Sequence, residues 1–343
     1  MKILTDFTII DRKVWTAYVE QHPNGMVFHL PEMVDLYAEA DKVQPLVVCA
    51  QSDEGVILGL LIALVQWDFK GALRLLTKRS IIMGGPIVTD NDSVVAEAIM
   101  AAYESEVRSY GAIFSQYRNL TDMQWMDCIF RKKGYTYKEH LDIQHDLTVE
   151  RETIISGVDK NKRGNVRKST NKGTTFEEIE THEDYLKCLE LVYGTYNRVG
   201  LPCPSTGYFE AAWKHLMPTG RMKTFVARLE GEIIGTRLEL VCGQNIYDWW
   251  AGSDDAQKNK YPNDFIPYNI LLWGHDNGYA LFDFGGAGHP NKPYGVREHK
   301  LKFGGTLVNF GRYEKTHKPL LMLIGRMGFP IYKAMKKLIM RSK

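Results

Sequence analysis

Residues 279–305 read YALFDFGGAGHPNKPYGVREHKLKFGG, an apolar run followed by a glycine-rich loop and a basic segment. The apolar residues 280–284 predict a buried strand that ends at Gly285 and Gly286. Glycine pairs occur where a ligand or another backbone comes close, because they lack the Cβ atom that would block it. The stretch therefore predicts a strand end at which backbone amides and one cation, Lys300, lie beside a ligand. A pair of turns around a surface hairpin is the alternative.

The chain reads as one unit written twice. Residues 45–65 and 224–241 each alternate in the manner of two antiparallel strands, with turns that contain Gly55 and Gly231. In both hairpins a further glycine follows the turn glycine after four residues. A helical stretch precedes each hairpin, and a helix followed by a strand comes after it. The helical stretches before the hairpins are 32–40 and 183–198. Those after the hairpins are 92–109 and 263–277, and they lead into strands that begin near 112 and 280.

This order of elements makes an α+β unit with a mixed central sheet flanked by helices. It resembles the acyl-CoA N-acyltransferase (GNAT) fold, so we expect two tandem GNAT-like domains. The polar, strongly basic segment 148–175 has helical potential and marks the boundary. We expect a first domain of residues 1–147, completed by 306–343, and a second domain of 148–305 that carries the active site.

The length of 343 residues also predicts about two domains. With 44% hydrophobic and 24% charged residues, the composition is typical of a globular protein and argues against disorder. The five cysteines are scattered without CxxC spacing, so we expect reduced thiols in a cytoplasmic protein and no metal site. The start of the chain does not read as a signal peptide, and the longest apolar run, 56–65, is too short to cross a bilayer.

The C-terminal segment is basic. From Lys315 onward the sequence contains Lys and Arg but neither Asp nor Glu, and apolar residues alternate with the cations. Such a pattern in 316–343 predicts an amphipathic helix on an anionic membrane surface, which would place the protein at the inner face of a membrane. The alternative is that the apolar side packs on the body of the protein. The oligomeric state is not predicted.

Four segments together resemble the FemABX family and its FemAB-like acyltransferase relatives. They are IIMGGPI (81–87), KNKRGNVRKSTNKG (160–173), FDFGG (282–286) and HKLKFGG (299–305). The resemblance implies two tandem GNAT-like domains, with the last segment returning to complete the first. The best-known members attach amino acids from aminoacyl-tRNA to the peptide amine of peptidoglycan precursors.

Aminolysis of an ester needs a cation or amide donors at the developing oxyanion and an acceptor for the proton of the amine. The resemblance implies that Lys300 assists at the acyl carbonyl or at the ester leaving group; a solvated loop lysine is the alternative. Asp283 is the second catalytic candidate, because it can orient a substrate amine. Capping of the turn at Gly285 is the more common use of such an Asp.

The candidate substrate-binding residues lie in both halves: Gly285, Gly286, His289, His299, Tyr247, Trp249, Arg163, Arg167, Gly84, Gly85, Gln116 and Arg118. His299 stands where the family usually has an aromatic residue. Because neighbours on a strand point to opposite faces, only one of Trp249 and Trp250 is expected to line the cleft, and core packing is the alternative. Arg163 and Arg167 are four residues apart on the basic helix, so they share one face and can bind phosphate, unless that face is merely solvated.

Departures from the family leave the substrates open. Where the peptidoglycan enzymes have an acidic residue, the chain has Ser115, Gln116, Tyr117 and Arg118, and no loop of the type that cradles coenzyme A follows residues 245–251. We expect an N-acyltransferase that acts on a cell-envelope precursor, with aminoacyl-tRNA or acyl-CoA as the donor. An acetyl-CoA-dependent N-acetyltransferase of an amino sugar or small amine is one alternative, and a non-catalytic binding module is another.

Overall fold

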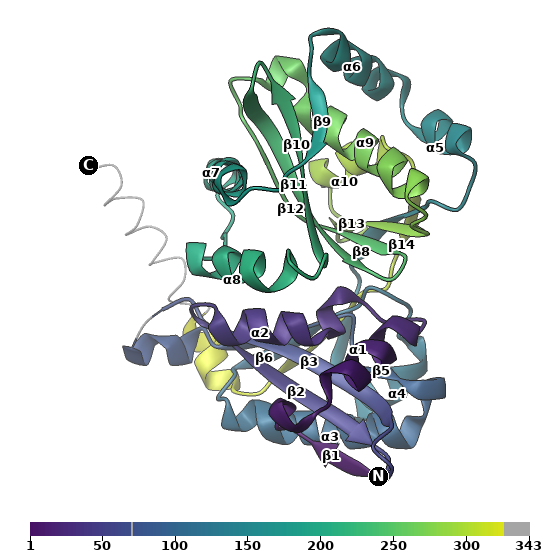
Figure 1. The fold of residues 1–343 in the computed structure, drawn as a ribbon. Helices are drawn as coiled ribbons and strands as arrows, with labels where there is room; N and C mark the ends of the chain where they lie inside the picture. Colours follow the sequence, from purple (N-terminus) through teal and green to yellow (C-terminus); the bar gives the residue numbers. More distant parts are fainter. Residues whose placement is uncertain (70, 326–343) are drawn as a thin grey trace. The chain divides into compact units, whose positions relative to one another are not determined.

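Each half of the chain builds its sheet around the hairpin expected from the sequence. In the computed structural model, which describes residues 1–69 and 71–325, β2 (Val43–Gln51) pairs antiparallel with β3 (Ile57–Gln66). In the same way, β10 (Met222–Leu229) pairs with β11 (Glu232–Cys242). The two hairpins belong to two compact units, which Figure 1 shows as two separate sheets with their helices.

Equivalent strands follow one another in the same order in the two sheets. The first sheet runs β1-β2-β3-β4-β6-β15-β7, with β5 beside β3. The second, read from its edge strand β9, runs β9-β10-β11-β12-β13-β8-β14. In the first sheet these are β1 (Lys2–Leu4), β4 (Arg79–Met83), β5 (Ile87–Val88), β6 (Phe114–Arg118), β7 (Thr136–Lys138) and β15 (Arg312–Thr316). In the second they are β8 (Leu141–Asp146), β9 (Thr175–Glu178), β12 (Asn245–Ser253), β13 (Leu281–Gly288) and β14 (Thr306–Val308).

Helices connect and cover these strands. The α-helices are α1 (Arg12–Gln21), α2 (Pro31–Glu39), α3 (Ser93–Ser109), α4 (Asp127–Lys132), α5 (Arg151–Gly157), α6 (Lys160–Asn171), α7 (His182–Val199), α8 (Thr206–Leu216), α9 (Pro262–Asp276) and α10 (Gly295–Leu301). Short 3₁₀ helices are η1 (Phe7–Ile9), η2 (Val27–His29), η3 (Gly71–Leu76), η4 (Thr89–Asn91), η5 (Gln124–Met126) and η6 (Lys258–Lys260). In the second unit, α7 and α9 cover opposite faces of the sheet (Figure 1).

The matched glycine spacing has a physical cause. Gly59 and Gly235 both pair with an alanine of the neighbouring strand, and both pairs lie next to a β-bulge. A Cβ atom at Gly59 would come within 2.6 Å of Ile99 Cδ1 on α3, and one at Gly235 within 2.7 Å of Pro262 Cβ on α9. The glycines therefore let the crossover helix of each unit lie directly on the second hairpin strand, which confirms the duplication.

The units exchange one strand each. β8 begins three residues after β7 ends, yet it pairs with β13 and β14 in the second sheet. β15 begins four residues after β14 ends and pairs with β6 and β7 in the first sheet. The sequence predicted the return of the last segment but not the transfer of residues 141–146.

Consequently the compact units divide the chain at positions other than those expected. The first contains the described residues of 1–24, 40–138 and 311–343, and the second contains 25–39 and 139–310. Besides β8, the second unit includes α2, a helix expected to belong with the first hairpin, because α2 packs against α8. The basic segment between the halves forms α5, α6 and β9.

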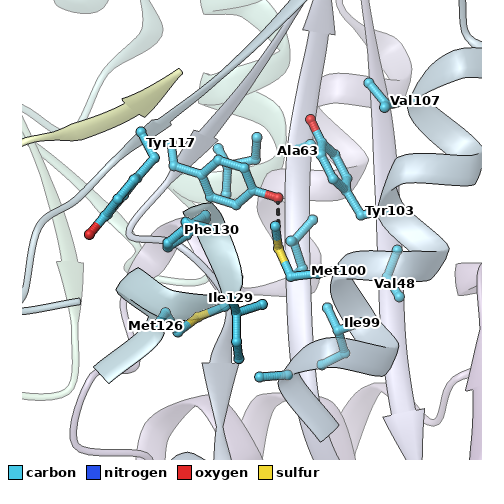
Figure 2. Packing of buried hydrophobic residues seen from close by; sticks show 14 of the residues in the cluster. Val48, Ala63, Ile99, Met100, Tyr103, Val107, Tyr117, Met126, Ile129 and Phe130 are labelled. Atoms are coloured by element: carbon cyan, nitrogen blue, oxygen red, sulfur yellow. Dashed lines mark hydrogen bonds between the residues drawn. The ribbon is translucent and has the colours of Figure 1, made fainter. Parts of the chain in front are cut away.

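Each unit has its own core. In the first, Figure 2 shows Tyr117 between Phe130 on α4 and Met100 on α3, with its hydroxyl donating to Met100 Sδ at 3.2 Å. In the second, Phe282 and Phe284 of β13 are fully buried together with Phe303. The alternate residues of β13 are therefore fixed by packing, and this fixes the strand that carries the FDFGG motif.

Within the described part of the chain, no helix combines the length and apolar character that a bilayer span needs. Of the segment predicted as an amphipathic helix, residues 326–343 lie outside the described residues. A helical turn begins at residue 319.

Candidate active site

β12 and β13 lie parallel for only three residues before they diverge. Residues 245–247 pair with 281–283, after which β12 remains with β11 and β13 remains with β8. Main-chain groups of β13 beyond Asp283 therefore face no hydrogen-bonding partner on β12. Such a divergence opens a place in the sheet where a ligand or a side chain can reach the backbone.

Lys300 reaches this place from α10. Its Nζ donates to the carbonyl oxygen of Phe284 and lies 3.4 Å from that of Gly286. Gly285 adopts a φ of +72°, and a Cβ atom there would lie 3.7 Å from both Lys300 Nζ and the Tyr247 hydroxyl. Thus the predicted residues Lys300, Gly285, Gly286 and Tyr247 come together.

The strand itself continues further than the sequence indicated. β13 was expected to end at Gly285 and Gly286, but it runs to Gly288, with shifts of register against β8 on both sides of Gly286. Gly285 and Gly288, with φ angles of +72° and +77°, permit these irregularities, because one type of bulge places a glycine in the left-handed region. The loop begins after Gly288.

Buried carboxyl groups influence the Lys300 ammonium. Burial lowers the pKa of Lys300, and the charge of Arg237 lowers it further, whereas Asp248 and Asp142 act in the opposite direction. Burial raises the pKa of Asp142 well above its usual range, and the charge of Asp283 adds to this effect. The site thus holds a cation in surroundings where charge is poorly solvated, which strengthens its interaction with a developing anion.

Asp283 maintains the bulge. Its Oδ1 accepts the amide of Gly285 at 2.8 Å, and its Oδ2 accepts Gln144 Nε2 at 3.1 Å. Burial raises the pKa of Asp283 even though these hydrogen bonds favour the charged form. Asp283 therefore makes the turn-capping contact that the sequence offered as an alternative to the substrate amine.

Three functional candidates on β11 and β12 were missed from the sequence. Glu239 is opposite Asp248, and Arg237 Nη1 lies 2.5 Å from Asp248 Oδ2 in a buried ion pair. Burial, together with the charge of Asp248, raises the pKa of Glu239 well above its usual range. The sequence could have pointed to two of them. Arg237 and Glu239 are charged residues two apart in a mostly apolar strand, which puts both on one face.

A bulge also changes the orientation of the tryptophans. Trp250 pairs with Leu238 and Asp248 with Glu239, so Trp249 is an extra residue on β12. Both indole rings consequently approach Phe209 of α8, at centroid distances of 6.3 Å for Trp249 and 5.6 Å for Trp250. Strict alternation therefore fails at this bulge, and the expectation that only one of the two lines the cleft stays a prediction.

His299 contacts the basic helix. Its Nδ1 lies 3.1 Å from Nζ of Lys162, which forms an ion pair with Asp264 of α9. Burial and the charge of Lys162 lower the pKa of His299 to about 4, so the imidazole is neutral at pH 7. On the basic helix α6, the predicted phosphate-binding residue Arg163 is half-buried and Arg167 is exposed. These contacts join α6, α9 and α10.

His289 belongs to the loop after β13. Its Nδ1 accepts the amide of Asn291 at 3.1 Å, and its carbonyl accepts Arg297 Nη1 at 2.9 Å. These hydrogen bonds organise the loop between β13 and α10. In the part of the chain that the structure describes, no hydrogen bond joins His289 to Lys300.

The remaining candidates lie together in the first unit. The Gly84 amide donates to Arg118 O at 2.9 Å. Arg118 Nε donates to Gln116 Oε1 at 2.7 Å, and Gln116 Nε2 donates to Glu314 at 2.6 Å. Gly85, with a φ of +71°, lies against Met123. These residues form a group around the ends of β4 and β6.

No set of three or more His, Cys, Asp or Glu side chains in residues 1–69 and 71–325 is arranged to hold a metal ion.

Comparison with known proteins identifies one domain and the fold. Residues 160–300 match the family described as acetyltransferase (GNAT) domain. Among solved structures, FemX is similar with a TM-score of 0.75 and 16% identity over 95% of this chain and 100% of that chain. L-PGS from Bacillus licheniformis has a TM-score of 0.57 and 16% identity over 92% and 96%, respectively. A tandem GNAT protein from the clavulanic acid biosynthesis pathway has a TM-score of 0.59 and 11% identity over 92% and 98%.

No curated protein matches the chain in sequence. The family match and the two equivalent sheets confirm the α+β fold of two tandem GNAT-like units. Residues 160–300 thus form a GNAT acyltransferase domain, and the chain has the FemX-like tandem fold that the resemblance in sequence indicated. A GNAT domain implies acyl-CoA as a co-substrate.

Proposed function

We propose that the protein transfers an aminoacyl or other acyl group to an amine of a cell-envelope precursor, with the reaction at Lys300. The observation that carries this proposal is the position of the Lys300 ammonium on the Phe284 and Gly286 carbonyls, where β12 and β13 diverge. The fold of FemX and of L-PGS supports the choice of an envelope substrate.

In the proposed reaction, the amine nitrogen attacks the acyl carbon and the carbonyl oxygen becomes negative. Lys300 stabilises this oxygen, because a fixed cation in poorly solvated surroundings interacts strongly with developing charge. As the bond to the donor breaks and the amide forms, the amine loses one proton and the leaving group gains one. Asp248 is our candidate acceptor, because its buried Oδ1 lies outside the ion pair that its Oδ2 makes with Arg237.

The start of α9 suits a donor that carries phosphate. Nζ of Lys168 and Nζ of Lys172 lie 5.8 and 5.9 Å from the ring centroid of Tyr261, the residue at the N-cap of α9. At this N-terminus Pro262 has no amide hydrogen and the amides of Asp264 and Phe265 bind Tyr261 O, so the attraction for phosphate comes from the lysines and the helix dipole. Both donor classes, acyl-CoA and aminoacyl-tRNA, contain it, so these residues fit either one. Asp264 in the first turn does not oppose this, because Lys162 neutralises it.

The test is transfer to a nucleotide-linked muropeptide, with aminoacyl-tRNA and acyl-CoA supplied in separate reactions. We expect Lys300→Ala to lower kcat by about 100-fold or more, the usual effect of removing one oxyanion stabiliser. Lys302→Ala is the matched control, since Lys302 is an exposed lysine two residues away, and it should retain activity. Unchanged kcat in Lys300→Ala would refute the assignment.

A second candidate is acetyl-CoA-dependent N-acetylation of an amino sugar or small amine. The match to an acetyltransferase family favours it. A ligand that binds only the native state raises the melting temperature, so acetyl-CoA and aminoacyl-tRNA can be compared directly by thermal shift. Stabilisation by acetyl-CoA, with acetyl transfer to an amino sugar and none to the muropeptide, would favour this second candidate.

A further inference from the structure

Exposed apolar side chains gather on two neighbouring segments of the first unit. η3 and the helical turn that begins at residue 319 lie together, since a Cβ atom at Gly325 would come within 3.2 Å of Leu76 O. The exposed residues, with exposed fractions between 47% and 70%, are Leu73, Leu75, Leu320, Leu323 and Ile324. We call this set the leucine patch. Single exposed leucines are normal on a protein surface, but five on two adjoining segments are not.

The outward direction of the patch follows from helix geometry. Residues 320, 323 and 324 have the i, i+3, i+4 spacing of one helix face. The residues between them, Leu321 and Met322, are half-buried. The turn therefore packs one apolar side on the protein and leaves a second apolar side in solvent. Such an arrangement is expected of a surface that binds an apolar partner.

Positive charge accompanies the patch. Arg74 lies between the two exposed leucines of η3, and Lys318 immediately precedes the helical turn. Burial lowers the pKa of Lys78, and the charges of Arg74 and Lys318 lower it further, so these cations are close enough to influence one another. Lys78 Nζ also lies 5.3 Å from the ring centroid of the half-buried Trp67. The nearby Asp68 is neutralised by Arg79, at 2.7 Å.

We propose that the leucine patch, with Arg74, Lys78 and Lys318, is a docking surface for an anionic lipid bilayer. Leucines that enter the acyl boundary beside cations that bind lipid phosphates are the combination that holds a protein at such a surface, and charge selects anionic lipid. Trp67 suits the same interface, because an indole has an apolar body and a polar edge. This surface is built from described residues and does not depend on the reaction proposed for Lys300.

Vesicle co-sedimentation of the full-length protein tests the proposal. We expect binding to vesicles of equal parts phosphatidylglycerol and phosphatidylcholine, and at least about tenfold weaker binding to phosphatidylcholine alone. The double variants Leu73→Ser/Leu75→Ser and Leu320→Ser/Leu323→Ser should each weaken binding by about tenfold, because each removes two side chains from the acyl boundary. Arg74→Gln/Lys318→Gln should weaken it about as much, and only on anionic vesicles.

Val94→Ser/Val199→Ser is the matched control, since Val94 and Val199 are equally exposed valines outside the patch, and it should bind like the wild type. Unchanged melting temperatures would show that the leucine variants remain folded. Wild-type binding by both leucine variants would overturn the proposal. So would equal binding to neutral and anionic vesicles. A dimer in solution that dissociates on the same leucine substitutions, without any vesicle binding, would assign the patch to a second copy of the chain instead.

Discussion

Glu239 and Asp248 lie directly opposite one another on β11 and β12, and no hydrogen-bond donor among the described residues contacts either oxygen of Glu239. Two buried carboxyl groups that face each other each disfavour the charged form of the other. Burial and the neighbouring carboxylate identify Glu239 as the protonated group. Asp248 forms the ion pair with Arg237.

Replacing Glu239 with Gln tests this directly. A carboxyl group whose pKa is raised on folding stabilises least at high pH, because the unfolded state loses its proton first. Above the ordinary value of 4.5, wild-type stability should therefore fall relative to Glu239→Gln, and the difference should widen as pH rises. Urea unfolding at pH 5 and pH 8 measures it. Glu232→Gln, at an exposed position of the same strand, should show no such trend, and a constant difference for Glu239→Gln would contradict the pairing.

His145 predicts the opposite dependence on pH. Burial lowers its pKa from 6.5 to about 4, so the folded state keeps it neutral while the unfolded state takes up a proton. Unfolding free energy should thus decrease as pH falls from 6.5 to 4, by up to about 3 kcal/mol from this residue. Comparing urea unfolding of the wild type and His145→Gln over that range isolates the contribution. If the unfolding free energies of the two proteins changed in parallel with pH, this contribution of His145 would be ruled out.

If Asp248 accepts the proton of the amine, Asp248→Asn should lower kcat by about 10²–10⁴-fold. The remaining rate should rise more steeply with pH than that of the wild type, because the amine then has to lose its proton to solvent before attack. A purely structural effect, such as an unpaired Arg237, lowers the rate without changing the shape of the pH profile. Rate measurements between pH 6 and pH 9 distinguish the two, and parallel profiles would remove Asp248 from the mechanism.

Gly235→Ala should destabilise the second unit by about 1–3 kcal/mol, because the new methyl group meets the rigid ring of Pro262. Gly194→Ala is the contrasting control. Gly194 lies in α7 with open space around its Cα, so the substitution should be neutral or should stabilise the helix by up to about 1 kcal/mol. Thermal unfolding of both variants checks the pair. A melting temperature of Gly235→Ala equal to that of the wild type would mean that α9 can move away from the new methyl group at no cost in stability.

The features that could be predicted are those whose cause is local in the sequence. The hairpins and crossover helices follow from alternation, turn glycines and the need for Gly59 and Gly235 under a helix. Lys300 and the FDFGG motif were found together because α10 follows β13 after a short loop. The return of β15 was implied by the family resemblance, but the transfer of β8 could not be predicted, since its residues are compatible with either sheet and only long-range pairing selects one.

The rest of the site was missed for a related reason. Asp142, Glu239 and Asp248 come from three strands, and each alone resembles a chance polar residue in a strand. Their proximity depends on the order of strands in the sheet and on the bulge at Trp249, neither of which periodicity reveals. The bulge also explains why both tryptophans face Phe209, contrary to simple alternation.

The exchanged strands affect the order in which the protein can be completed during synthesis. The first sheet needs β15 between β6 and β7, so that position stays open while nearly the whole chain is translated. The second sheet receives β8 early and can close once β14 has left the ribosome. The unit that is synthesised first is therefore finished last, and for most of translation its unpaired strand edges are exposed to other chains, the kind of exposure that makes folding intermediates prone to aggregation.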